Sequence, residues 1–238
     1  MRRKLYYINV ILSLFILIIL QSCKKENEAE IIKNNIDFSY YPQKVGSWII
    51  YQIQEIKIDA PSNYYDTANY QIKELFESEF IDNTGNTSYR IERYERDNNN
   101  TPWKIKDVWT SELSNNSAQK VEENIKFVKI NFPAELNKAW NGNIYNTSSY
   151  EEYKITDIDK NENINNIIFD FVLTVLQRDE ENLIEKYYSV EKYAKNTGLI
   201  FKQNIDITSM YILPGEPYYK RIKTGTIYLQ KIIDFGLN

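Results

Sequence analysis

The chain has 238 residues but no histidine and only one cysteine, and these scarcities exclude several kinds of chemistry. Without histidine, no Ser-His-Asp or Cys-His nucleophile arrangement can form, and no histidine-ligated zinc or iron site can form. The single thiol, Cys23, excludes a disulfide within the chain and a cysteine-ligated iron–sulfur cluster. We therefore expect no metal, no cofactor and no catalytic residue, and we predict that the protein is not an enzyme.

Glycine and proline are also scarce, with 7 and 6 residues, so asparagine and aspartate must form many of the turns. Aromatic residues are abundant instead: 20 tyrosines, 10 phenylalanines and 4 tryptophans provide material for a core and favour strands. The net charge is −4. Because lysine and arginine supply most of the affinity for nucleic acid, an acidic chain without a long basic run predicts no nucleic-acid partner.

The first 22 residues have the layout of a secretory signal peptide. A basic start at residues 2–4 precedes an apolar run from Val10 to Leu20 and then the small residue Ser22. The apolar run is about a dozen residues, shorter than the ~20 needed to span a bilayer as a helix. The signal-peptide interpretation is therefore preferred to an uncleaved transmembrane helix.

The four residues Leu20-Gln21-Ser22-Cys23 resemble the lipobox of bacterial lipoproteins. The resemblance implies that Cys23 is lipidated, with palmitate among the acyl chains, and that it becomes the mature N-terminus. Several acyl chains on one residue give stable membrane anchoring. Removal of residues 1–22 takes away three basic residues and no acidic one, which changes the net charge from −4 to −7.

The junction after Cys23 is similar to that of Bacteroidota lipoproteins, in which charged residues at this place can mark export to the cell surface. We therefore expect a lipid-anchored protein of the cell envelope, held at the outer membrane, with its periplasmic or surface face left open. The polar residues 23–35 lack periodicity and are interpreted as a flexible tether. Residues 36–238 are predicted to form a single β-rich domain.

The body of the chain has the pattern of an all-β protein. From Tyr70 to Phe80, residues alternate with a period of two, and Ile72, Glu74 and Phe76 share a face that is mainly apolar. Further strand patterns recur every 10 to 15 residues, separated by hairpin-like turns, and no long helix follows the signal peptide. This predicts an antiparallel sheet that forms an open barrel or a sandwich.

Four segments carry more specific expectations. Residues 60–67 contain Pro61 and are predicted to be a loop. Residues 121–132 are predicted to be one strand and residues 167–176 a buried central strand, whereas residues 183–194 fit either a strand or a helix.

Three stretches of the mature chain, residues 41–51, 132–142 and 193–200, resemble a diffuse set of uncharacterised bacterial secreted proteins and lipoproteins. The shared features are an opening with Pro42, Gly46 and Trp48, a central proline and tryptophan, and a late Tyr-Ala followed by Gly-Leu-Ile. The set has no agreed activity, so the resemblance carries over no catalytic residue.

Four aromatic residues are candidates for stacking against a ligand such as a sugar: Tyr64, Tyr65, Trp103 and Trp109. Core packing is the competing interpretation for the two tryptophans, whereas the tyrosine pair falls in the predicted loop. The sequence Asp66-Thr67-Ala68 matches the short O-glycosylation motif of Bacteroidota, which makes Thr67 a candidate for glycosylation.

These features predict a lipid-anchored module that binds a partner or has a structural role. The first alternative is a carrier or receptor for lipid or another apolar ligand in an open β-barrel, and the second is a glycan-binding accessory lipoprotein. The candidate partners are therefore the membrane, reached through the lipid anchor, and a lipid, a glycan or an envelope protein. A large apolar cavity favours the carrier, whereas an interior filled by side chains counts against it.

Overall fold

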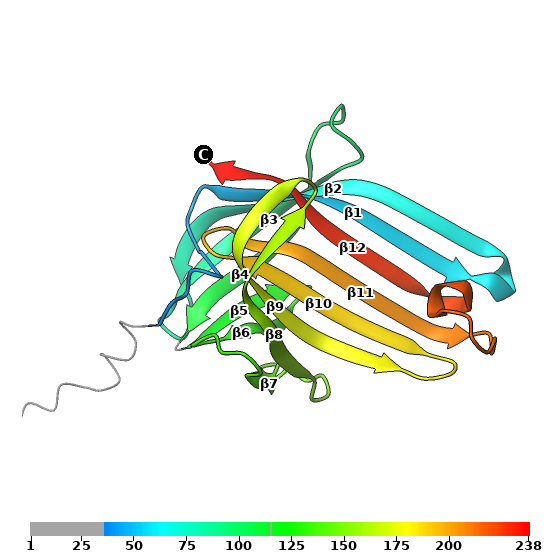
Figure 1. Cartoon of the computed structure of the whole chain (residues 1–238). Helices are drawn as coiled ribbons and strands as arrows, with labels where there is room; N and C mark the ends of the chain where they lie inside the picture. The colour runs from blue at the N-terminus through cyan, green and yellow to red at the C-terminus, as the bar shows by residue number, and fades with distance from the viewer. Residues whose placement is uncertain (1–35, 115) are drawn as a thin grey trace, which may run out of the picture. The chain divides into compact units, whose positions relative to one another are not determined.

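A computed structural model describes residues 36–114 and 116–238, of which Asp37–Asn238 form one compact unit. The predicted signal peptide, the tether and Cys23 lie outside the described residues. About 66% of these residues are in strands (Figure 1), and the other regular elements are two short 3-10 turns, η1 (Ala60–Ser62) and η2 (Tyr218–Lys220). Among the residues described, no helix has the length and apolarity needed to cross a membrane.

The described residues form one twelve-stranded sheet in which every pair of neighbouring strands is antiparallel. The strands are β1 (Ser47–Asp59), β2 (Tyr64–Ile81), β3 (Thr87–Arg96), β4 (Lys104–Ser114), β5 (Ser117–Glu122), β6 (Ile125–Asn131), β7 (Ala139–Asn141), β8 (Glu152–Ile164), β9 (Ile167–Glu181), β10 (Lys186–Ala194), β11 (Gly198–Met210) and β12 (Ile222–Leu237). The spatial order is β6-β5-β4-β3-β2-β1-β12-β11-β10-β9-β8-β7, so the first and last strands pair at the centre.

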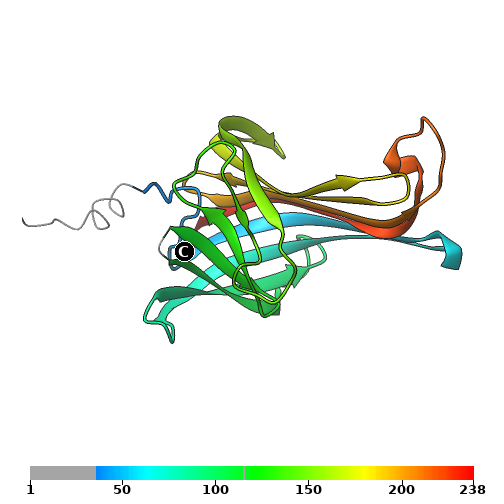
Figure 2. The ribbon, with the colours of Figure 1, turned by 90° about the horizontal axis from the view of Figure 1, so that it is seen from below.

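The sheet curls into a nearly closed barrel, so that its two edge strands, β6 and β7, approach each other (Figure 2). The backbone N–H of Val128 in β6 donates to the carbonyl of Gly142, just after β7, at 2.9 Å. The indole Nε1 of Trp140 in β7 donates to the carbonyl of Val128, also at 2.9 Å. The all-β antiparallel prediction is confirmed, and the open barrel is the correct one of its two forms.

An apolar core lies under the central strands. Its buried members are Tyr51, Ile53, Ile72, Ile164, Phe169, Val172, Ala194, Ile200 and Ile232. They come from both halves of the chain, so packing in this cluster fixes the two halves of the barrel to each other. The side-chain amide of Asn165, in the turn between β8 and β9, donates to the carbonyl of Ile232 at 3.0 Å and holds that turn against β12.

Three hairpins extend beyond the closed part of the barrel: β1–β2, β9–β10 and β11–β12 (Figure 1). Their strands are adjacent in the sheet, and their turns lie together at one end of the domain. Because β3 ends opposite Gln71, the residues of β2 before Gln71 pair only with β1 in this extension.

Several element boundaries differ from those that the sequence predicts. Residues 64–67 are strand, because β2 begins directly after the left-handed residue Asn63. The strand predicted over 121–132 is instead the end of β5, a two-residue turn and β6, since Glu123 and Asn124 both have positive φ angles. Of residues 183–194, which fit a strand or a helix, 186–194 form the strand β10 and 183–185 lie in the turn before it. The strand predicted as central over 167–176 is part of β9, which is third from one edge of the sheet.

Candidate functional site

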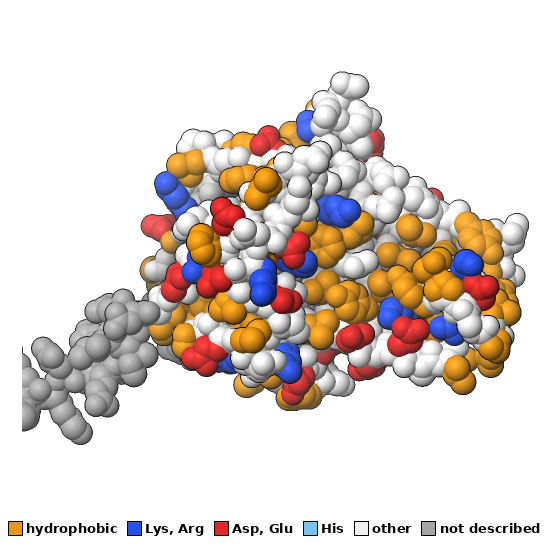
Figure 3. Space-filling model, viewed as in Figure 1, with side chains coloured by type: hydrophobic (Ala, Val, Ile, Leu, Met, Phe, Trp, Pro, Cys, Tyr) orange, Lys and Arg blue, Asp and Glu red, His pale blue; other side chains and the backbone are white. Residues whose placement is uncertain are grey.

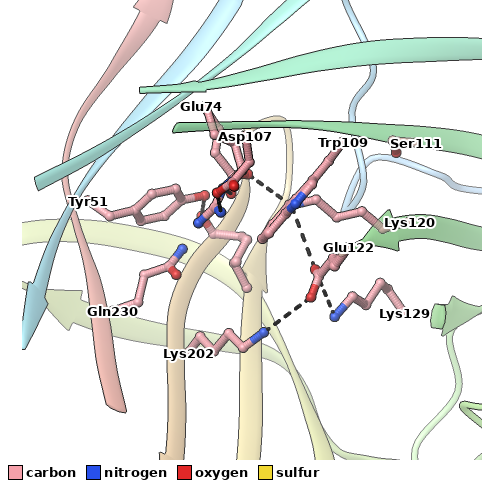
Figure 4. Close-up of polar contacts among 12 residues, drawn as sticks. Tyr51, Glu74, Asp107, Trp109, Ser111, Lys120, Glu122, Lys129, Lys202 and Gln230 are labelled. Carbon is pink, nitrogen blue, oxygen red and sulfur yellow. Dashed lines mark hydrogen bonds and ion pairs between the residues drawn. The ribbon is translucent and has the colours of Figure 1, made fainter. Parts of the chain in front are cut away.

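The interior of the barrel is crossed by a chain of ion pairs, here called the interior ion-pair cluster (Figure 4). Its members are Glu74 in β2, Arg93 in β3, Asp107 in β4, Lys120 and Glu122 in β5, Lys129 in β6, Glu191 in β10 and Lys202 in β11. Four acidic and four basic side chains give the cluster a formal charge of zero. It joins strands that lie on opposite walls of the barrel.

Arg93 is the centre of the first half of the cluster. Its Nε lies 3.1 Å from Glu74 Oε1 and its Nη1 lies 2.7 Å from Asp107 Oδ2. The strand register places these three side chains on one face, since Glu74 pairs with Arg93 and Arg93 pairs with Asp107. The second oxygen of Glu74 accepts a hydrogen bond from Lys120 Nζ at 2.9 Å.

The second half of the cluster is a four-membered ring. Lys129 Nζ lies 3.0 Å from carboxylate oxygens of both Glu122 and Glu191. Lys202 Nζ lies 3.5 Å from Glu122 and 3.2 Å from Glu191. Lys120 joins the two halves, because its Nζ is also 3.9 Å from Glu122.

The four-membered ring keeps its two acids and two bases ionised. Burial alone would raise the pKa of Glu122, but the charges of Lys129 and Lys202 outweigh burial and hold the pKa well below its ordinary value. Burial likewise opposes the charged form of Glu191, and the same two lysines lower its pKa to about 2. For Lys129, burial would lower the pKa, but the two glutamates raise it overall. None of these groups is therefore poised to exchange protons near neutral pH, which is unlike a general acid or base.

Trp109 contributes an aromatic surface to the interior. The guanidinium carbon of Arg93 lies 3.5 Å from the centre of its ring, and Lys120 Nζ lies 4.7 Å from it. The indole Nε1 donates to Glu123 Oε1 at 3.3 Å. The ring is thus held by cations and a carboxylate, which fixes its orientation in the barrel.

A cavity of about 270 Å³ opens beside the cluster. Its lining includes the cluster residues Glu74, Arg93, Lys120, Glu122 and Lys202, the aromatic residues Tyr70, Trp109 and Tyr228, and the polar residues Asn204 and Gln230. We call it the interior cleft.

Gln230 is the unusual member of this lining. Its side chain is only 3% exposed, and its Oε1 accepts a hydrogen bond from the Tyr228 hydroxyl at 2.7 Å. Its Nε2 has no hydrogen-bond partner among the described residues. A buried amide left without an acceptor costs free energy of roughly 1–3 kcal/mol. The interior cleft therefore offers one unused hydrogen-bond donor beside several charges.

The predicted ligand-stacking residues do not meet in one place. Trp109 lies in the interior cleft, whereas Trp103 precedes β4 and packs against the guanidinium of Arg96, 4.2 Å from its ring centre. Tyr64 and Tyr65 are exposed at the start of β2, at the tip of the β1–β2 hairpin. As neighbours on a strand they point to opposite faces, so they do not form one flat platform.

Thr67 is an exposed residue of β2, paired with Ile56 of β1. Its hydroxyl is thus on a regular strand of the extended hairpin rather than in a loop. Its glycosylation stays a prediction, as does the lipidation of Cys23.

No family model and no curated protein matches the chain. Among solved structures, it is similar to a Bacteroides fragilis protein assigned as exported and given a YmcC-like fold. The identity is 9%, over 82% of this chain and 98% of that one, with a TM-score of 0.45. It is also similar to a protein from Parabacteroides distasonis assigned as a lipoprotein, at 12% identity, with the same two coverages and a TM-score of 0.39.

Proposed function

We propose that the protein is a lipid-anchored component of the cell envelope whose domain binds a small polar ligand in the interior cleft. The signal-like leader and the lipobox-like residues before Cys23 support the anchor. The observation that carries the binding role is the unpartnered Nε2 of Gln230 in a cleft lined by charged and aromatic side chains. A ligand oxygen that accepts from this amide would remove the cost of the unused donor.

The interior is less suited to a lipid carrier. An acyl chain placed in this part of the barrel would meet the interior ion-pair cluster, and it would separate buried charges from their partners without replacing them. A saccharide fits the cleft better, because its hydroxyl groups both accept and donate hydrogen bonds. The glycan-binding alternative is therefore contained within this proposal.

We propose that the domain is a binding module rather than an enzyme. Both glutamates of the four-membered ring are ion-paired, with pKa values held low, and the sequence has no histidine. The cluster is suited to hold a ligand in a fixed electrostatic environment.

Native mass spectrometry of the full-length protein, purified in detergent from its own cells, tests this function. We expect a bound polar species of low mass in the wild type. The substitution Gln230→Leu should remove it, since leucine has similar volume and no amide. Gln54→Leu, on the exposed side of β1, is the matched control and should retain it. A wild-type protein without any bound species, or a species that Gln230→Leu retains, would contradict the proposal.

The extended hairpins favour a second candidate function, the binding of an envelope protein. Hydrophobic side chains gather at this end of the domain (Figure 3), and the exposed residues at the three turns are Tyr64, Tyr65, Leu183, Ile184, Tyr211, Ile212, Leu213 and Tyr219. Exposed apolar residues that lie together in this way mark interaction surfaces. A photo-crosslinking residue in place of Ile212 should capture one envelope protein in intact cells. The same residue in place of Ile144, which is equally exposed elsewhere, should not, and equal capture at both positions would count against this role.

A further inference from the structure

A second and larger cavity, of about 640 Å³, lies apart from the interior cleft. One wall is the segment that runs from Asn143 into the start of β8, and the other is the end of β9, from Gln177 to Glu180. We call it the β8–β9 groove.

The β8–β9 groove is acidic. Four carboxylates line it, from Glu151, Glu152, Asp179 and Glu180, against the single cation of Arg178. Arg178 is already paired, because its Nη2 lies 2.8 Å from Glu180 Oε2. Three negative charges therefore remain in the groove without a basic partner in its lining, and their combined field favours a cationic ligand.

Glu151 is the most confined of these carboxylates. It is partly buried, and no ion pair to it occurs among the described residues. Burial raises its pKa, and the neighbouring charge of Glu180 adds to this, whereas Arg178 and Asn143 act in the opposite direction. A cation placed beside Glu151 would offset the cost of holding this charge away from water.

The Gln177 amide requires a hydrogen-bond acceptor on the ligand. Its side chain is 6% exposed, and its Oε1 lies 2.8 Å from Ser189 Oγ, which acts as the donor. Its Nε2 has no hydrogen-bond partner among the described residues. A simple metal ion or amine carries no acceptor for this amide, and the described residues hold no group of three or more side chains arranged to bind a metal. A peptide supplies both a carbonyl acceptor and a basic side chain.

We infer that the β8–β9 groove binds a peptide segment that carries a lysine or arginine side chain. The basic side chain lies against Glu151, and a backbone carbonyl of the peptide accepts a hydrogen bond from Gln177 Nε2. The volume of the groove suits a few residues of extended peptide. The exposed ring of Tyr150, whose hydroxyl donates to Glu152 at 3.3 Å, forms part of the same wall.

Isothermal titration calorimetry of the full-length protein in detergent, with the peptide acetyl-Ala-Lys-Ala-amide, tests this inference. Acetyl-Ala-Gln-Ala-amide and butylamine serve as ligand controls, because the first lacks the charge and the second lacks the carbonyl groups. The variants are Glu151→Gln and Gln177→Leu, with Glu79→Gln as an exposed carboxylate control on β2. Leucine has a similar size to glutamine, and the Ser189 hydroxyl keeps a second partner, Asn204 Oδ1 at 2.8 Å, when the Gln177 amide is removed. Gln177→Leu therefore leaves no buried hydroxyl without a partner and stays a folded test.

The lysine peptide should bind the wild type and the Glu79→Gln variant equally. Glu151→Gln should weaken its binding by about tenfold or more, since a charge-assisted contact is lost, and Gln177→Leu should weaken it by a smaller factor. The glutamine peptide and butylamine should both bind more weakly. Failure of the lysine peptide to bind, equal binding of butylamine, or an affinity that Gln177→Leu leaves unchanged would each overturn the inference.

Discussion

Lys129→Met should be among the most destabilising single substitutions in the barrel, because it removes one cation from the four-membered ring. The Lys129 side chain is 4% exposed, and its Nζ contacts Glu122 and Glu191 at 3.0 Å each. Methionine fills similar space without charge. The two buried carboxylates then share only Lys202, at 3.5 and 3.2 Å, apart from the distant Lys120. Removing one partner of a buried ion pair typically costs about 3–5 kcal/mol of unfolding free energy, and we expect a loss in that range at pH 7.

The pH dependence of this loss gives a sharper signature than its size. In the wild type, the pKa of Glu191 is lowered from 4.5 to about 2. Its contribution to stability is therefore complete above about pH 4.5 and is lost as the pH falls toward 2. In the Lys129→Met variant, burial acts with less compensation, and we expect the pKa values of Glu122 and Glu191 to rise above the ordinary value of 4.5 that they have in the unfolded chain. Protonation then relieves the buried charge, and the variant should recover part of its stability as the pH is lowered from 7 toward 5.

Urea unfolding followed by tryptophan fluorescence, at pH 7 and pH 5, measures both effects. Lys220→Met is the matched control, because Lys220 pairs with Glu216 at 2.8 Å on the surface, where such pairs contribute less than about 1 kcal/mol. A loss below about 1 kcal/mol for Lys129→Met, or a loss of equal size at both pH values, would refute the view that the ring is a buried, mutually dependent set of charges.

Three further predictions follow from single positions. Gly142→Ala should lower the free energy of unfolding by about 1–3 kcal/mol, because its Cβ would lie 2.4 Å from the Tyr153 ring. Thr147→Ala, at an exposed position of the same loop, should cost less, and equal losses in urea unfolding would contradict this. Cys23→Ser should move the protein from the membrane to the soluble fraction of lysed cells, whereas unchanged membrane retention would rule out the lipid anchor. Mass spectrometry should find a glycan on the peptide that contains Thr67, and an unmodified peptide would dismiss that motif.

The strands could be predicted from sequence where one face is buried and the other is exposed. The alternating segment from Tyr70 to Phe80 lies within β2. The errors fall at turns that lack glycine: the β5–β6 turn uses Glu123 and Asn124 at φ angles of 49° and 63°. A glutamate seldom adopts positive φ, so the sequence held no signal for that turn, and one long strand was predicted instead.

The extension of β2 was missed for a different reason. Pro61 and the polar residues around it favour a loop, and the 3-10 turn η1 does contain Pro61. The strand begins only three residues later, at Tyr64, because its partner β1 continues to Asp59 and pairs with β2 from Tyr64 to Leu75. Pairing with β1 determines the conformation of this segment more strongly than its local residue pattern does. The sequence of the segment alone does not reveal that pairing.

One member of the interior ion-pair cluster did carry a signal in the sequence. Glu74 lies on the mainly apolar face of its strand, between Ile72 and Phe76, where an unpaired charge would be costly. A charged residue in that position indicates a buried partner. The partners themselves, Arg93 and Lys120, come from β3 and β5, so their identity depends on the order of strands in space.

A crystal structure of the full-length protein purified from its own cells would test the central claim, that the interior cleft holds a small polar ligand, most directly. We predict non-water electron density in the cleft, with an acceptor atom within hydrogen-bond distance of Gln230 Nε2. An isolated ordered water bonded to that amide, with the rest of the cleft holding solvent, would contradict the claim. The interior ion-pair cluster would then be a structural feature of the barrel.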